Sequence, residues 1–248
     1  MEHILLPTSV EFQETDEKNV GKVIITPCHQ GYGTTLGNAL RRVLLSSLPG
    51  AAVESVKIQG VQHEFSAIPG VQEDVIEVIL NLKQLAVRSF SDGPVTLHLS
   101  KKGKGEVRAK DFEKNADIEI ANPELVLCTL TDDTAFDMEV VVGKGRGYVP
   151  VSEKETAHLD LGTVAIDSLY TPIRDVGYTV EMTRVGDVTN YEKLAVRIET
   201  NGTVSPKEAL GQATKMLMDH FALIMDVTGG DVEAKKGKKN EEEENEAV

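Results

Sequence analysis

Apolar residues recur every three or four positions through residues 34–48 and form one continuous stripe. This spacing is typical of an amphipathic helix that is buried along one side. A charged pair, Arg41 and Arg42, interrupts the stripe. Because proline disfavours helical geometry in the residue before it, Pro49 and Gly50 predict the end of the helix. The stripe consists of Leu36, Ala39, Leu40, Val43, Leu44 and Leu48.

Alternating apolar and polar residues, the pattern of β-strands, mark a series of short segments. A helix at about residues 72–84 interrupts the series, and there apolar residues return to helical spacing. Glu73 and Asp74 are expected in its first turn, where the helix dipole favours acidic residues. The predicted strands are Val20–Pro27, Val53–Ile58, Val95–Ser100, Ile118–Ile120, Leu125–Leu130 and Met138–Val142.

The alternation becomes longer from Gly177 onwards. It predicts two antiparallel strands, around Tyr178–Thr183 and Leu194–Glu199, joined by a polar loop. Ser205 then predicts the start of the last helix, because its side chain can cap the backbone in a capping box that Glu208 completes.

The last helix, about residues 205–227, changes character at Met216. From there apolar residues lie on nearly every side, which predicts burial on all sides. A second partner surface is the favoured explanation, and self-association is the commonest kind. The alternative is a central core helix of a monomer.

The charge balance bears on the kind of partner. Lys and Arg number 26 against 40 Asp and Glu, a formal net charge of −14. Since nucleic-acid affinity comes mostly from basic residues that neutralise phosphates, the chain is a poor candidate for binding DNA on its own. Trp is absent, and Phe and Tyr are few, which argues against base stacking on single strands. Residues 231–248 are almost wholly polar and predict a disordered acidic tail.

Cysteine usage and the N-terminus indicate a compartment. Cys28 and Cys128 lie far apart and belong to no CxxC motif, so we predict neither a disulfide framework nor a cysteine zinc site. A reducing, cytoplasmic location fits. The N-terminus lacks the features of a signal peptide, and no apolar run is long enough to span a membrane.

Few segments contain residues that could form a catalytic or ligand-binding site. The turn Gly31–Gly37 precedes a helix, as phosphate-binding loops do, but its GxGxxxG spacing departs from the nucleotide motif. A tight turn that lets the helix pack closely is the favoured interpretation. The loop Gly143–Pro150, with Lys144 and Arg146, is either a binding loop or a solvated hairpin turn. No metal-ligand spacing and no nucleophile motif is found, so we predict no catalytic residue, metal or cofactor.

Five segments together resemble the α subunit of bacterial DNA-directed RNA polymerases. They follow one another in the family's order, and the resemblance covers about residues 4–230. The segments are Gly31–Ser47, Gly70–Lys83, Gly145–Pro150, Tyr170–Arg174 and Glu199–Thr203, the last with Pro206 and Ala209.

The resemblance implies an α+β fold in two parts. A discontinuous dimerisation domain of antiparallel strands and two helices would comprise residues 1–49 and 174–230, and an inserted β-rich domain would comprise residues 50–173. The two helices would pack against their copies in a homodimer. The interface would contain Leu36, Leu40, Val43, Leu44, Leu217, Phe221 and Ile224.

The resemblance also implies partners. In this family the α dimer is a non-catalytic platform on which the β and then the β′ (beta-prime) subunit assemble, with omega and sigma in the holoenzyme. An arginine suits such docking, because its planar fork makes several directional hydrogen bonds. Docking of β would use Asn38, Arg41, Arg42, Leu45 and His63 on one copy. Docking of β′ would use Lys83, Ile166 and Asp167 on the other, with the segment that follows to Arg184.

One departure from the family pattern concerns the C-terminus. Full α subunits continue into a small domain that binds upstream promoter DNA, whereas this chain ends at Val248, so we expect that domain and its DNA contacts to be missing. Two rival functions stay open. A nucleotide-binding enzyme would use the glycine turn with Arg41 and Arg42, and a DNA-binding regulator would show salt-sensitive binding.

Overall fold

The structure is a computed structural model that describes residues 4–155 and 159–228. The predicted tail, residues 231–248, lies outside the described residues. In chain order the elements are β1 (Ser9–Glu14), β2 (Val20–Cys28), α1 (Tyr32–Ser46), β3 (Pro49–Ile58), α2 (Val75–Leu82), β4 (Val87–Ser89), β5 (Val95–Lys102), β6 (Gly105–Arg108), the 3-10 turn η1 (Ala109–Asp111), β7 (Ile118–Ile120), β8 (Val126–Leu130), β9 (Ala135–Arg146), β10 (Tyr148–Val149), the 3-10 turn η2 (Val151–Glu153), β11 (Thr163–Ala165), β12 (Ser168–Leu169), β13 (Ile173–Val185), β14 (Val188–Thr200) and α3 (Pro206–Thr228).

These elements confirm the predicted α+β class. Within the described ranges there are three α-helices, and every strand pair is antiparallel. The chain divides into two compact units at Ala213 and Thr214, inside α3. The division into a dimerisation domain and an inserted domain stays a prediction.

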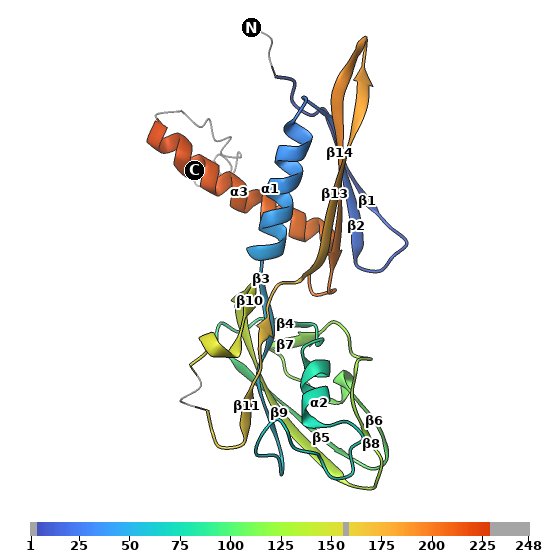
Figure 1. Cartoon of the computed structure of the whole chain (residues 1–248), viewed down its shortest axis with the longest axis vertical. Coiled ribbons are helices and arrows are strands. Elements are labelled where there is room, and N and C mark those ends of the chain that lie inside the picture. Colours follow the sequence, from blue (N-terminus) through green and yellow to red (C-terminus); the bar gives the residue numbers. More distant parts are fainter. Residues whose placement is uncertain (1–3, 156–158, 229–248) are drawn as a thin grey trace, which may run out of the picture. The chain divides into compact units, whose positions relative to one another are not determined.

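A four-stranded sheet has the order β1-β2-β14-β13. β13 and β14 form the predicted hairpin and are 13 residues long each, so they extend well beyond the alternation seen in the sequence. β2 pairs with β14, which places Val23 opposite Val196 (Figure 1). β1 was not predicted, because its side chains are mostly exposed or half-buried and show no clean alternation.

Helix α1 packs against the hairpin and contacts both β13 and β14 (Figure 1). It begins and ends two residues before the predicted bounds, and β3 opens at Pro49 after Ser47 and Leu48. The buried side of α1 consists of Gly33, Gly37, Leu40 and Leu44. Leu40 and Leu44 of the predicted stripe thus lie on this side, whereas Leu36, Ala39 and Val43 are half-buried.

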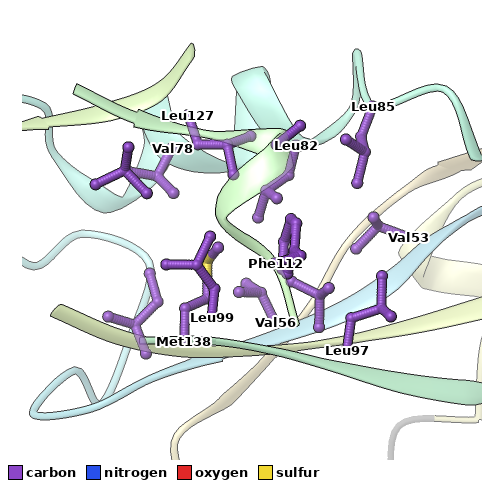
Figure 2. Packing of buried hydrophobic residues seen from close by; sticks show 14 of the residues in the cluster. Val53, Val56, Val78, Leu82, Leu85, Leu97, Leu99, Phe112, Leu127 and Met138 are labelled. Carbon is purple, nitrogen blue, oxygen red and sulfur yellow. The ribbon is translucent and has the colours of Figure 1, made fainter. Parts of the chain in front are cut away.

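A second sheet has the order β5-β9-β3-β4-β7, and β11 also pairs with β3. α2 and the β6–β8 pair lie over it, and a hydrophobic core fills the space between them. Figure 2 shows Val78, Leu82 and Leu127 on one side of this core, Leu97, Leu99 and Met138 on the other, and Phe112 between them. Three strands of this sheet are longer than predicted, since β3 begins at Pro49, β5 ends at Lys102 and β9 extends from Ala135 to Arg146.

The start of α2 corrects the sequence interpretation. Asp74 is the N-cap rather than a first-turn residue, and its side chain and that of Glu77 form a capping box. Glu73 lies outside the helix, where its carboxylate accepts hydrogen bonds from the backbone nitrogen (2.6 Å) and Oγ1 (3.0 Å) of Thr129 in β8. The helix is therefore shorter than predicted at both ends.

Helix α3 begins as the sequence predicts. The Oγ atom of Ser205 accepts a hydrogen bond of 3.2 Å from the backbone nitrogen of Glu208. Ala209 and Ala213 are fully buried. No helix in the described ranges is both long and apolar enough to cross a bilayer.

Candidate functional site

The outer side of α1 presents a row of exposed residues. Asn38, Arg41, Arg42 and Leu45 follow one another at the i, i+3, i+4, i+7 spacing of one helix face. No carboxylate of the described residues forms an ion pair with Arg41 or Arg42. These four sequence-predicted residues thus lie together, with two cations available to a partner.

The face is held in place by close contact on the other side of the helix. A Cβ atom at Gly37 would lie 2.6 Å from the ring of Tyr178, and one at Gly33 would lie 2.8 Å from Oε2 of Glu192. No side chain fits at either position. Two turns of α1 can therefore approach the hairpin as closely as backbone allows, as predicted for the glycine turn.

The turn before α1 binds the carboxylate of a glutamate from the same chain. Glu192 in β14 is 7% exposed, and its Oε1 and Oε2 atoms accept hydrogen bonds of 2.9 Å from the backbone nitrogens of Gly31 and Gly33. Gly31 has the left-handed φ of 86° that this turn requires. A phosphate would need these same donors. The glycine turn is therefore already occupied, which removes the support for the nucleotide-binding alternative.

A second candidate site is a groove of about 660 Å³ beside α2 and β11. Lys83 and Asp167 line it and form an ion pair, with Nζ 2.9 Å from Oδ2. The backbone nitrogen of Val151 donates to the other oxygen, Oδ1, at 2.9 Å. The hydrogen bond from Lys83, followed by that from Val151, holds the pKa of Asp167 below its ordinary value. The structure thus places all three residues predicted to bind β′, Lys83, Ile166 and Asp167, along this groove.

The other two predicted residues at this groove behave differently. Ile166 also lines the groove, but it is 1% exposed and belongs to the hydrophobic core. His63, expected with the β-docking residues of α1, lines the groove instead and shares a contact of 3.1 Å with Oγ of Ser66. The groove also has exposed apolar walls. They include Phe65, Ile76, Leu80, Leu159 and Leu161.

The predicted dimer residues fall into two groups. Leu40 and Leu44 are buried within the single chain, and Leu36 and Val43 are half-buried on α1. On α3, Leu217 is half-buried, whereas Phe221 and Ile224 are 58% and 59% exposed. Exposed apolar side chains are thus frequent on the second half of α3. Its exposed apolar residues are Met218, Phe221, Leu223, Ile224, Met225 and Val227.

The segment Gly143–Pro150 is not a loop. Its first residues belong to β9, and Tyr148 and Val149 form β10, so the interpretation as a binding loop or hairpin turn is wrong. Glycine is needed here for space, since a Cβ atom at Gly145 would lie 2.7 Å from the ring of Tyr170.

Sequence reasoning missed several polar residues of these sites. Lys154 and Glu54 contribute to the environment of Asp167, and Glu192 anchors α1. Glu192 lies in a strand of alternating residues, where a charged side chain is normally predicted to be exposed. The residues next to Lys154 in the sequence give no sign that it is half-buried. Among residues 4–155 and 159–228, no three His, Cys, Asp or Glu side chains are grouped as metal ligands.

The fold and the sequence comparisons define the class. The family model described as the RNA polymerase Rpb3/RpoA insert domain matches residues 56–171. A protein from Symbiobacterium thermophilum, named DNA-directed RNA polymerase subunit alpha, is 48% identical over 229 residues, 92% of this chain and 73% of the relative. The proteins of that name from Clostridium kluyveri and Alkaliphilus metalliredigens are 49% and 47% identical, over 88% and 86% of this chain and 70% and 68% of their own lengths.

The chain is thus an RNA polymerase subunit of the class that carries this insert domain. It belongs to the family of bacterial DNA-directed RNA polymerase α subunits.

Proposed function

We propose that the chain forms a homodimer that serves as the platform on which the β and then the β′ subunit of RNA polymerase assemble. It contributes no catalytic residue and binds no cofactor. Residues 1–49 and 174–230 form the dimerisation domain, and residues 50–173 form the insert. Omega and sigma join in the holoenzyme, which works in the cytoplasm, and the chain itself does not bind DNA strongly.

The observation that carries this proposal is the exposed face of α1. This face combines one apolar side chain with polar side chains at fixed helical spacing, and the other side of the helix packs against the sheet. Its residues are Asn38, Arg41, Arg42 and Leu45. Arginines are frequent among the residues that dominate interface energies. This face is the docking surface for β.

The groove beside α2 supports a second docking surface. Lys83 and Asp167 offer charged groups next to exposed apolar side chains such as Phe65 and Leu80, which is the mixture found in protein–protein interfaces. Since one copy of the dimer binds β and the other β′, the groove of the second copy takes β′. The exposed half of α3 supports the dimer, because large exposed apolar patches on a chain mark association surfaces.

The test is the mass of the purified chain by light scattering, alone and mixed with β. We expect a dimer of the 27.0 kDa chain that captures one β. Arg42→Ala should keep the dimer and weaken β capture, whereas Arg88→Ala, which removes an exposed arginine from β4, is the matched control. A monomer, or undiminished β capture by Arg42→Ala, would overturn the proposal.

A further inference from the structure

Lys154 lies between η2 and β11, and its ammonium group is half-buried. It donates hydrogen bonds to the carbonyl oxygen of Ile166, to Oγ of Ser168 at 2.6 Å and to the carbonyl oxygen of Glu54 at 3.3 Å. An ammonium group has three donors, and here each has an oxygen partner. The side chain thus joins the segment around Asp167 to Glu54 of β3, which is far away in the sequence.

Two of these points lie on either side of Asp167. Ile166 is also tied to β3, because its backbone nitrogen donates to the carbonyl of Glu54 at 2.9 Å. Ser168 is tied to the same strand, because its Oγ donates to the carbonyl of Val53 at 2.7 Å. Asp167 therefore extends from a backbone that is held before and after it, towards Lys83 and Val151.

Opposing effects act on the charge of Lys154. Burial lowers the pKa of Lys154, and the negative charges of Glu54 and Asp167 oppose that effect, while Lys83 adds to it. A neutral side chain of the same length would leave three acceptors without their donor. Arginine keeps the charge and more than one donor, so it is the conservative replacement.

We propose that Lys154 is a positioning residue for the β′ docking site. Its ammonium group fixes the backbone on both sides of Asp167 and so holds the Lys83–Asp167 pair in the geometry that β′ binds. The inference rests on the proposed function, since it needs β′ to dock at this pair.

The experiment compares capture of β and of β′ by the full chain. Lys154→Met should leave the dimer and β capture unchanged and weaken β′ capture by the dimer–β complex on the order of tenfold. Lys154→Arg should restore much of that loss. Lys102→Met makes the same substitution at an exposed lysine of β5 and serves as the control. If Lys154→Met does not fold, Ser168→Ala can be tested in its place, because it removes the hydroxyl group that binds Lys154.

A double-mutant cycle separates positioning from general stability. Once Asp167→Ala has removed the positioned group, Lys154→Met should weaken β′ capture no further. Additive losses, or equal losses of β and β′ capture, would overturn the positioning role. Unchanged β′ capture by Asp167→Ala would instead refute the proposed β′ site, so the two failures are distinguishable. Weakening by Asp167→Ala together with normal capture by Lys154→Met and Ser168→Ala would refute this inference alone.

Discussion

The carboxylate of Glu192 in β14 lies 2.9 Å from the backbone nitrogen of Gly33 in the first turn of α1. Its second oxygen binds Gly31 at the same distance, so one buried side chain caps the helix from a distant strand. Glu192 follows the alternation of β14, in which Leu194, Val196 and Ile198 are also buried, so its side chain lies on the inner face of the strand. The cap therefore comes from the regular strand that packs against α1.

Glu192→Ala should destabilise the chain by about 1–3 kcal/mol, because it leaves backbone donors without their partner. Urea unfolding followed by circular dichroism measures the change. Glu181→Ala removes an exposed glutamate of the same hairpin, which pairs with Lys193 at 3.5 Å, and should change the free energy of unfolding little. Equal effects of the two variants would contradict a capping role for Glu192.

Two glycine-to-alanine changes should have opposite signs. Gly37→Ala forces a methyl group to within 2.6 Å of the Tyr178 ring and should destabilise by about 1–3 kcal/mol. Gly211→Ala in α3 meets no atom within 4 Å and should stabilise by up to about 1 kcal/mol, because alanine favours helix. Thermal or urea unfolding distinguishes them. A stabilised Gly37→Ala variant would show that α1 can move away from the hairpin.

The Lys83–Asp167 pair should make stability depend on pH. The folded chain holds the pKa of Asp167 below its ordinary value of about 4, so the unfolded chain takes up this proton more readily. The pair therefore stabilises at neutral pH, and that contribution is lost as the pH falls below about 4. Urea unfolding at a series of pH values should show a shallower acid loss in Asp167→Asn than in the original chain. An identical slope in both chains would refute it.

Phe221→Asp should give a folded monomer. In the single chain Phe221 is 58% exposed, so an aspartate there does not disturb the fold, but in the proposed dimer it buries a charge at a cost on the order of 3–5 kcal/mol. Light scattering reports the mass. Phe65→Asp replaces an aromatic ring that is 76% exposed outside the proposed interface and should leave the dimer intact. A dimeric Phe221→Asp variant would place the interface elsewhere.

Both cysteines should be unreactive in the folded chain. Cys28 and Cys128 are buried, and burial raises the pKa of Cys128 to about 12 and that of Cys28 above its ordinary value. Since the thiolate is the reactive form, a thiol reagent at pH 8 should label neither until the chain is unfolded by denaturant. Rapid labelling of Cys128 without denaturant would contradict the packing of β8.

Local spacing predicted most helices and strands, because a helix or strand pattern extends over neighbouring residues. It could not predict which acid caps α2: Asp74 does so only because Thr129 of β8 holds Glu73 outside the helix. The candidate sites show the same division. The outward row of α1 follows from spacing alone, whereas the environment of Asp167 depends on Lys154 and on the tie of Ser168 to β3.

The pairing of β2 with β14 has a consequence for synthesis on the ribosome. β2 ends at Cys28, yet its neighbour begins only at Val188, so the strand waits for most of the chain to emerge before its central partner exists. The sheet that contains β3 and β9 includes no strand after β11, so it can form earlier. Non-local pairing of this kind is slow and leaves strand edges exposed meanwhile. The N-terminal β1–β2 pair therefore keeps one open edge until β14 has been synthesised.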